Sequence, residues 1–479
     1  MSRAGNLLVI LSDEHAATAL GIAASDVTVH TPNLDRLAAR GVRFTDAYTP
    51  SPICVPARAA FATGRRVHDI RLWDNAMPYK GQPRGWGHGL QDSGIRVESI
   101  GKLHYRNSED DTGFDRQTLP MHVAGGHGMV YGSLRREDER VCQRSTRMLG
   151  DYIGPGDSPY TQYDAAVTDR TCAWLSDAAG GRDPWCLYVG LVAPHFPLVV
   201  PQAFLDLYPE GCLPPLRLHP RDGYEKHPWV ALHDQAFVGD DGMVDEAERQ
   251  MARRVYYALC SYLDHNVGRI LDALEAAGLS ETTTVIYSSD HGDNVGTRGL
   301  WGKGNFYQES AAVPLIVAGP GLPQGALCRT PATLLDISET ILDHFGATLE
   351  GTRPGRSLYD LIAELEDPER VVFSEYHAVG AVSGGYMLRK GSWKLIHYQG
   401  FPPEMFDLQS DPGETVNRAA DPACMAKRAE LYAALHAICN PAEVDAMAFE
   451  DQDALIASYG GREAAMKVGA VGATPPPKG

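Results

Sequence analysis

The stretch LLVILSDE, residues 7–14, begins with five apolar residues in a row and ends in two acids. An unbroken apolar run bounded by polar residues is typical of a strand that is buried on both faces of a sheet. In open α/β sheets, binding sites lie beyond the carboxyl ends of the strands. We therefore expect a buried strand at residues 7–11 and a candidate site at Asp13 and Glu14, although these two acids would also suit a helix cap.

The chain continues with an alternation of strand-like and helix-like segments. Strands are expected at residues 185–192, 282–288 and 314–318, and helices at residues 32–40, 163–177 and 245–277. Such alternation predicts an α/β fold in which helices sandwich a large, mostly parallel sheet. Two irregular stretches, residues 107–158 and 201–242, are long enough to be functional loops or insertions.

Beyond about residue 367 the pattern changes to short strands separated by turns. Strand-like segments at residues 371–376, 386–389 and 393–398 are followed by a helix near residues 426–438. Closely spaced strands of this kind predict an antiparallel meander. We therefore expect a catalytic α/β domain at residues 1–366, a small C-terminal α+β domain at residues 367–466 and a flexible tail at residues 467–479.

The composition is that of an ordinary globular protein, with a formal net charge of −18. This charge argues against nucleic-acid binding and against anionic membranes. No stretch approaches the roughly 20 apolar residues of a membrane span, and the run at residues 7–11 is too short for a signal-peptide core. The nine cysteines are scattered and include no CxxC pair, a pattern typical of reduced thiols. We expect a cytoplasmic protein.

The stretch CVPARAAFATG, residues 54–64, carries the strongest chemical signal in the chain. Pro56 suits the first turn of a helix, and Gly64 suits its end. Cys54 would then face the positive end of that helix, with Arg58 one turn further along. An arginine is a planar, permanently charged group that suits tetrahedral oxyanions. The pattern predicts a nucleophile beside an anion site, and a buried cysteine in an ordinary helix is the alternative.

Asp290 and His291 follow the strand expected at residues 282–288, as Asp13 and Glu14 follow the first strand. Two strands thus deliver adjacent acids, and one histidine, to the same edge of the sheet. Carboxylate oxygens with few nitrogen atoms suit a hard divalent ion. The pattern predicts a metal site, and a polar turn after the second strand is the alternative.

Further polar side chains follow other strands or lie in glycine- and proline-rich turns. Lys102 and His104 alternate on an extended segment, so both can face one pocket. His195 lies between two prolines, and Lys303 lies between two glycines that would let the backbone approach a ligand. Asn75 fits a turn equally well. Taken singly, each of these side chains suits an exposed position as well as a site.

Together these motifs resemble the type I sulfatases of the alkaline phosphatase superfamily, and in particular the bacterial choline sulfatases. The resemblance rests on Cys-x-Pro-Ala-Arg at Cys54, Gly-Lys-x-His at Lys102 and Pro-His-x-Pro at His195. Phe61, where the family usually has Leu, and Glu14, where it more often has Asp or Gln, depart from the pattern. The resemblance implies metal ligands Asp13, Glu14, Cys54, Asp290 and His291, catalytic roles for Cys54, Arg58, Lys102, His104, His195 and Lys303, and substrate contacts from Asn75 and Glu375.

The resemblance also implies the chemistry. In this family a maturation enzyme, the formylglycine-generating enzyme, oxidises the motif cysteine to formylglycine, so that Cys54 would become the nucleophile that attacks a small-molecule sulfate monoester. One divalent ion is implied, with Ca²⁺ favoured over Mn²⁺ and Mg²⁺, and so is assembly into a homo-oligomer.

Two other functions stay open at this point. Phosphonate monoester and phosphodiester hydrolases of the same superfamily share the modified cysteine and the metal pairs, but they carry Tyr and Thr in place of Lys102 and His104. A metal-binding protein without catalysis is the second alternative.

Overall fold

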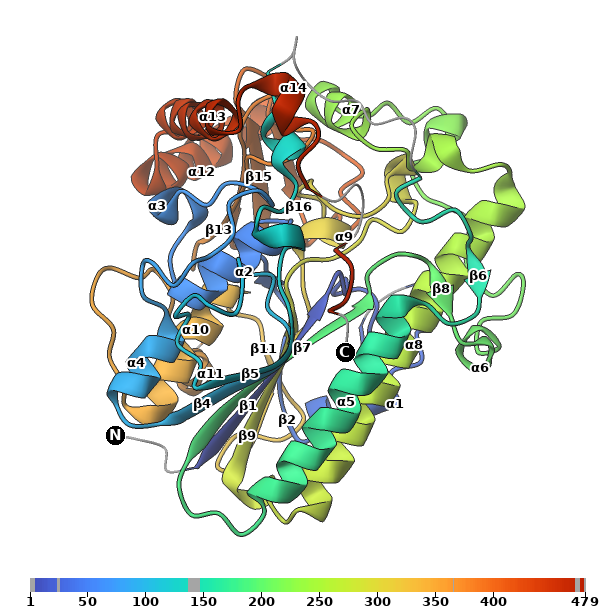
Figure 1. Ribbon diagram of the computed structural model, residues 1–479. Helices are drawn as coiled ribbons and strands as arrows, with labels where there is room; N and C mark the ends of the chain where they lie inside the picture. Colours follow the sequence, from blue (N-terminus) through green and yellow to red (C-terminus); the bar gives the residue numbers. More distant parts are fainter. Residues whose placement is uncertain (1–4, 24–25, 137–146, 365, 470–473, 478–479) are drawn as a thin grey trace.

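The computed structural model describes residues 5–23, 26–136, 147–364, 366–469 and 474–477 (Figure 1). Its centre is an eight-stranded sheet with the strand order β11-β2-β10-β9-β1-β7-β4-β5. The strands are β1 (Asn6–Asp13), β2 (Gly41–Phe44), β4 (Arg96–Lys102), β5 (Arg116–Met121), β7 (Trp185–Pro194), β9 (Thr283–Ser289), β10 (Leu315–Ala318) and β11 (Ala326–Cys328). The fully buried strand predicted at residues 7–11 is thus confirmed, and it lies at the middle of the sheet.

The sheet is mostly parallel, as the alternation of strands and helices predicts. Strands β9, β1, β7, β4 and β5 run parallel to one another, whereas β10 is antiparallel to both of its neighbours. Ser12 pairs with Ser289, and Asp13 pairs with Pro194. Because β1, β7 and β9 therefore end level with one another, the residues that follow them meet at one edge of the sheet.

Helices cover both faces of the central sheet (Figure 1). One layer contains α1 (Pro32–Ala39), α5 (Pro159–Ala178) and α8 (Glu246–Ala276), and the other contains α2 (Cys54–Thr63), α4 (Trp86–Asp92), α10 (Leu334–Phe345) and α11 (Leu358–Ala363). Side chains of a strand alternate between its two faces. Accordingly, Leu8 and Ile10 of β1 pack into the first layer, and Leu7, Val9 and Leu11 pack into the second.

The C-terminal part contains a second, antiparallel sheet, with β13 (Val372–Tyr376), β14 (Gly385–Lys390), β15 (Trp393–Tyr398) and β16 (Glu404–Asp407) in sequential order. One face packs on α12 (Met425–Ile438) and α13 (Pro441–Ser458). The other packs on aromatic side chains of the catalytic part, such as Trp229 and Phe306. The meander and the first helix were predicted, whereas β16 and α13 were not, and the domain boundary at residue 366 stays a prediction.

The predicted helices and strands of the central part lie within a few residues of the observed ones. The largest shift is at α5, which begins at Pro159 rather than at residue 163. Ser158 caps it, because its hydroxyl accepts a hydrogen bond from Thr161 N and Pro159 takes the first helical position.

Within the described ranges, no helix combines the length and the apolar character that a membrane crossing requires.

The remaining elements are short. They are β3 (Ala47–Tyr48), β6 (Gly154–Pro155), β8 (Val199–Val200), β12 (Ala332–Thr333), α3 (Val67–Ile70), α6 (Gln202–Leu205), α7 (Pro228–Asp234), α9 (Gln308–Ala311) and α14 (Arg462–Ala465). Several of them lie in the two stretches that the sequence marked as irregular.

Candidate active site

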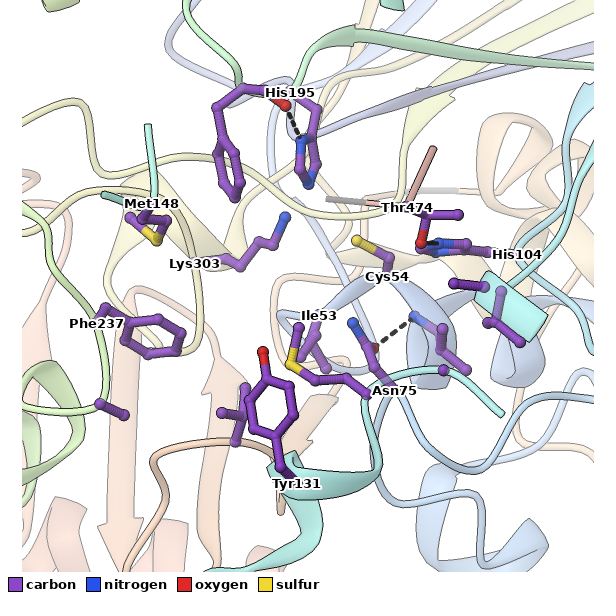
Figure 2. Close-up of a pocket in the computed structure, with 18 of the residues that line it drawn as sticks. Ile53, Cys54, Asn75, His104, Tyr131, Met148, His195, Phe237, Lys303 and Thr474 are labelled. Carbon is purple, nitrogen blue, oxygen red and sulfur yellow. Dashed lines mark hydrogen bonds between the residues drawn. The ribbon is translucent and has the colours of Figure 1, made fainter. Parts of the chain in front are cut away.

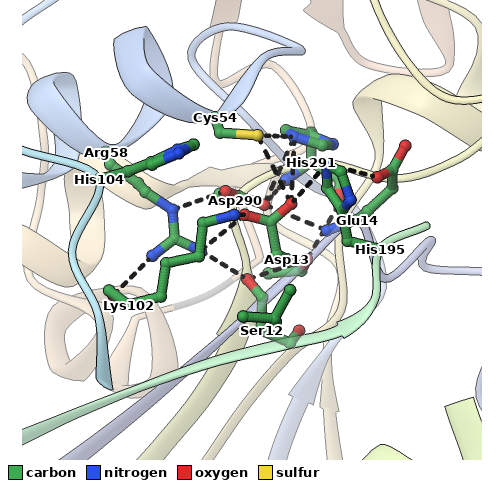
Figure 3. A network of polar contacts seen from close by, with 12 residues as sticks. Ser12, Asp13, Glu14, Cys54, Arg58, Lys102, His104, His195, Asp290 and His291 are labelled. Atoms are coloured by element: carbon green, nitrogen blue, oxygen red, sulfur yellow. Dashed lines mark hydrogen bonds and ion pairs between the residues drawn. The ribbon is translucent and has the colours of Figure 1, made fainter. Parts of the chain in front are cut away.

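A cluster of buried carboxylates and histidines lies where β1, β7 and β9 end (Figure 3). Asp13 is the last residue of β1, and Asp290 and His291 directly follow β9. Ligand atoms of Asp13, Cys54, Asp290 and His291 all lie within 4.8 Å of one another, and Asp13, Glu14 and His195 form an adjoining group by the same measure. All five metal ligands implied by the sequence are therefore brought to one place.

The donor atoms of this cluster fit a divalent cation. Two fully buried carboxylates close together repel each other unless positive charge lies between or beside them. Burial, together with the nearby carboxylates of Asp293 and Asp13, raises the pKa of Glu14 well above its ordinary value, so this buried acid would carry its charge readily only beside a cation. Oxygen ligands with one imidazole suit Ca²⁺, Mn²⁺ or Mg²⁺ better than a soft metal.

Cys54 is the first residue of α2, and the helix runs to Thr63 with Gly64 in the left-handed conformation, as predicted. Its Sγ lies 3.1 Å from His291 Nε2 and 3.5 Å from Asp13 Oδ1. Burial, together with the negative charge of Asp13, raises the pKa of the Cys54 thiol to about 12. The unmodified thiol is therefore a protonated and weak nucleophile in this environment.

Arg58 lies beneath the cluster rather than in the cavity. Its Nε donates to Asp290 Oδ2 at 2.7 Å and its Nη2 donates to Asp13 Oδ2 at 3.1 Å. Its remaining donors bind Ser12 O, Lys102 O and the Tyr188 hydroxyl. Burial disfavours its charge, but Asp290 and other neighbours hold the pKa of Arg58 well above its usual value. Arg58 therefore positions the two carboxylates, and it has no donor left for the anion that the sequence had assigned to it.

Lys102 connects the carboxylate cluster to the cavity. Its Nζ lies 2.7 Å from Asp13 Oδ2, and its side chain lines the cavity. Burial alone would raise the pKa of Asp13, but Lys102, His195 and Arg58 hold it well below its ordinary value. Asp13 is therefore a permanent anion, available to a cation at all physiological pH values.

Lys303, Glu14 and His195 form the opposite side of the site. Lys303 Nζ donates to Glu14 Oε2 at 3.0 Å, and His195 Nε2 lies 3.3 Å from the same oxygen. His195 Nδ1 lies 2.6 Å from Phe196 O. Because a carbonyl oxygen only accepts hydrogen bonds, we place the ring proton on Nδ1, and Nε2 then faces the site. Burial and the charge of Lys303 lower the pKa of His195.

Gly304, next to Lys303, has φ +93°, and a Cβ there would lie 2.5 Å from His233 Nε2. A glycine is therefore required for this close approach.

His104 has an unexpected partner in the C-terminal tail. Its Nε2 lies 2.9 Å from the Thr474 hydroxyl, and Tyr160 donates a 2.6 Å hydrogen bond to Thr474 O. Burial and Lys102 lower the pKa of His104. The described part of the tail, residues 474–477, forms no helix or strand, and these two hydrogen bonds hold Thr474 at the site, while the flexibility of residues 467–479 stays a prediction. Residues 470–473 and 478–479 of that prediction lie outside the described residues.

These side chains surround one cavity (Figure 2). Of the residues singled out from the sequence, the cavity is lined by Cys54, Asn75, Lys102, His104, His195 and Lys303. Asn75 Oδ1 accepts a hydrogen bond from Val55 N at 3.3 Å, which leaves its amide nitrogen on the cavity side. The motifs from distant parts of the sequence therefore converge.

The rest of the cavity wall was not identified from the sequence. It includes Met129, Tyr131, Met148, Phe237 and Tyr376. The first four lie in the two irregular stretches. The sequence predicted that these stretches are functional, but it did not show which of their residues line the cavity. Apolar loop residues resemble core residues in a sequence, so only the length of these stretches could have indicated their role.

Glu375 does not line the cavity, although the sequence assigned it to the substrate. It is fully buried, and its Oε1 accepts hydrogen bonds from His68 N and His68 Nδ1 at 3.0 and 2.8 Å. Its Oε2 lies 3.2 Å from His377 Nε2. Burial would raise the pKa of Glu375, but His68 and His377 hold it well below its ordinary value. Both carboxylate oxygens are therefore bound within the protein.

The fold and the arrangement of acids around a cysteine at a helix start are those of an α/β protein with a candidate metal centre at the ends of its central strands. The chain resembles the crystal structure of the phosphonate monoester hydrolase of Agrobacterium radiobacter, with a TM-score of 0.74 and 23% identity over 90% of this chain and 95% of that one. At this level of identity, the likeness shows the fold alone.

Comparison of sequences identifies the family. The sulfatase family model matches residues 5–347, and the model for the C-terminal part of N-sulphoglucosamine sulphohydrolase matches residues 296–440. The chain is 34% identical to a choline-sulfatase of Rhizobium meliloti, over 89% of this chain and 85% of that protein. It is 28% identical to arylsulfatase K of Danio rerio, over 87% and 80% of the two chains. The chain belongs to the sulfatase family and is a sulfuric ester hydrolase.

Proposed function

We propose that this protein hydrolyses a sulfate monoester through a formylglycine nucleophile derived from Cys54. The observation that carries the proposal is the convergence, around one cavity, of Cys54, a set of buried metal ligands and three groups able to handle the substrate's charge and protons, Lys102, His195 and Lys303. No single motif has this specificity, because each also occurs in ordinary turns and helices.

The divalent cation would be held by Asp13, Asp290, His291 and residue 54, with Glu14 at its side. When bound, it would supply positive charge for a sulfate oxygen and lower the pKa of a bound hydroxyl. The family resemblance favours Ca²⁺, while the imidazole of His291 would also suit Mn²⁺.

Different side chains of the cavity would have different roles in the cleavage of the S–O bond. A hydrated aldehyde at residue 54 carries two hydroxyl groups, of which one attacks sulfur while the S–O bond to the alcohol breaks. Lys102 and Lys303 would hold the negative charge of the sulfuryl oxygens, with the amide of Asn75 as a neutral donor. The Lys303 ammonium would deliver a proton to the departing alcohol, and His195, whose Nε2 lies near the same Glu14 oxygen, would relay that proton.

Release of sulfate would then require a base. His104 lines the cavity near Cys54, and it would take the proton of the second hydroxyl at residue 54. The C–O bond to sulfate breaks as the carbonyl re-forms, so the aldehyde is restored without attack of water on sulfur. A cysteine thiol has no second hydroxyl and cannot take this route.

Formation of the aldehyde requires a maturation enzyme in the native host. Mass spectrometry of the peptide that carries Cys54, taken from active native material, tests this directly. We expect formylglycine at position 54. Active protein with only the unmodified thiol would remove the mechanism, while leaving the family membership intact.

The alternative activity, hydrolysis of phosphonate monoesters or phosphodiesters, shares the nucleophile and the metal site. Lys102 and His104 favour a sulfate ester, because they stand where those hydrolases are expected to carry uncharged side chains. Paired kinetics on 4-nitrophenyl sulfate and on a 4-nitrophenyl phosphonate monoester decide between the two. A kcat/KM larger for the phosphonate would overturn the assignment.

A further inference from the structure

The cavity changes character away from the charged residues. Lysines and histidines line it around Cys54, but the lining also includes an apolar and aromatic wall of Ile53, Tyr131, Met148, Phe237 and Val379. Figure 2 shows Tyr131 and Phe237 of this wall on the side of the cavity away from His104. These apolar side chains come from four separate segments of the chain and point into the same space. If sulfate binds at the charged end, as the proposed function requires, the alcohol half of the ester must lie against this wall.

We infer that the alcohol half of the substrate is an uncharged apolar or aromatic group rather than a cationic one. The inference rests on the proposed function, and it names the substrate class of the same site. It departs from the substrate in the name of the Rhizobium meliloti relative, because the described residues that line the cavity include no carboxylate to balance a cationic alcohol.

The charge of the lining supports this directly. Within the described part of the chain, the ionic side chains that line the cavity are the cations Lys102, Arg147 and Lys303 and no carboxylate. Arg147 Nη2 donates to Glu248 Oε1 at 2.6 Å, so its charge is partly balanced outside the cavity. A cationic alcohol would lose its water next to like charges, which is costly without an anionic partner.

The sequence assigned Glu375 to this partner role, but in β13 the Glu375 side chain points away from the cavity. Tyr376 lines the cavity, and successive side chains of a strand point to opposite faces. Glu375 accordingly lies on the other face, between His68 and His377. Its charge is neutralised there, so it offers nothing to a substrate in the cavity.

Aromatic rings can also attract a cation through their faces. One such face is already used, because Lys303 Nζ lies 5.0 Å from the centre of the Phe196 ring. The wall therefore offers hydrocarbon and ring surface, which suits an alcohol that buries apolar area on binding.

Two esters of equal shape test the inference on the matured, metal-loaded enzyme. Choline sulfate and 3,3-dimethylbutyl sulfate differ only in the exchange of a quaternary nitrogen for carbon. We expect kcat/KM to be at least tenfold higher for the neutral ester. Choline is the better leaving group of the two, because its positive charge acidifies the alcohol, so leaving-group chemistry cannot produce this result.

The outcomes separate the inference from the proposed function. Equal or higher kcat/KM for choline sulfate would overturn the inference and leave the sulfatase assignment in place. If neither ester nor 4-nitrophenyl sulfate is hydrolysed by protein that contains formylglycine and metal, the proposed function itself fails.

A variant of the wall provides a second, independent test. Phe237→Glu places a carboxylate in the wall, and Phe237→Gln is the matched uncharged control. We expect the ratio of kcat/KM for choline sulfate to that for the neutral ester to be at least tenfold higher in the Glu variant than in the Gln variant. An equal ratio would show that Phe237 does not face the alcohol. The comparison on the unaltered enzyme decides the inference if either variant fails to fold.

Discussion

Two buried clusters in this protein combine acids with histidines, and they have opposite properties. The cluster of Asp13, Asp290 and His291 lies at the ends of central strands, beside a cavity. The cluster of Glu375, His68 and His377 lies beneath the smaller sheet. Both acids of the first cluster and the acid of the second are fully buried. Composition and burial therefore do not distinguish a ligand set from an internal ion pair.

The partners of the oxygen atoms make the difference. In the second cluster both oxygens of Glu375 accept hydrogen bonds from the protein, and its charge is matched by histidine. In the first, ligand atoms of Asp13, Asp290, His291 and Cys54 lie within 4.8 Å of one another, although Arg58 and Lys102 also donate to its carboxylates. We propose that a cation completes the first cluster, whereas the Glu375 carboxylate of the second is satisfied by hydrogen bonds from the protein alone.

The largest expected effect comes from removing the centre of the first cluster. Cys54→Ala deletes the nucleophile, and we expect kcat on 4-nitrophenyl sulfate to fall by about 10⁴-fold or more. The melting temperature should change little, because only a small side chain is lost. Initial-rate kinetics with a parallel thermal melt measure both. Activity within tenfold of the unaltered enzyme would contradict the assignment of Cys54.

Removal of the cation should have the next largest effect. Treatment with a chelator is expected to lower activity by about 100-fold or more, because both the ligand charges and the substrate oxygens lose their counter-charge. It should also lower the melting temperature, since binding to the folded state stabilises by about 2.7 kcal/mol at 100 times the Kd. Re-addition of Ca²⁺, Mn²⁺ or Mg²⁺ then identifies the metal. Full activity after exhaustive dialysis against chelator would show that the first cluster, like the second, needs no ion.

The second cluster should affect stability rather than catalysis. Glu375→Gln leaves the partly buried His68 without its anion, and we expect the free energy of unfolding to fall by about 3 kcal/mol. Denaturant titration at pH 6 measures this, with Glu369→Gln as a control, because Glu369 is exposed on the same segment. The kcat/KM for a sulfate ester should stay within threefold. A large rise in KM with unchanged stability would indicate that Glu375 contacts the substrate, as the sequence had suggested.

The pH dependence of this effect sharpens the comparison. The pKa of Glu375 is lowered in the folded state, despite burial, by His68, so its contribution is lost as pH falls below the ordinary glutamate value. The pKa of His68 is raised, despite burial, by Glu375, so that contribution is lost as pH rises through the folded value. The destabilisation caused by Glu375→Gln should therefore be largest between about pH 4.5 and 6.5. Unfolding titrations at pH 4, 5.5 and 8 test this, and a constant difference would show that the pair is not ionised.

The sequence was informative where chemistry depends on local order. Asp13 and Asp290 follow strands directly, and strands of a parallel sheet end at a common edge, so their meeting could be predicted. The start of α2 at Cys54 and its end at Gly64 follow from local capping preferences. These features need no knowledge of how distant segments pack.

The sequence was less informative where packing and register decide. Whether Glu375 or Tyr376 faces the cavity depends on one residue of register in β13, and no local signal sets it. Arg58 could be placed beside Cys54, but its occupation by Asp13 and Asp290 requires the finished sheet. Thr474 meets His104 across 370 residues, and the intervening fold alone determines that contact.

The division of the cavity between strand ends and loops has a consequence for how such enzymes diverge. Of the groups that hold charge, Asp13, Lys102 and Asp290 lie in or directly after strands of the central sheet, where a shift of one residue would disrupt the core. The wall that meets the alcohol is built from connecting segments, which tolerate insertion and exchange during evolution. A lineage can therefore change which alcohol its enzyme accepts without altering the groups that break the S–O bond. The overall sequence identity to a relative then reflects mainly these groups and the sheet that carries them, and says little about the alcohol.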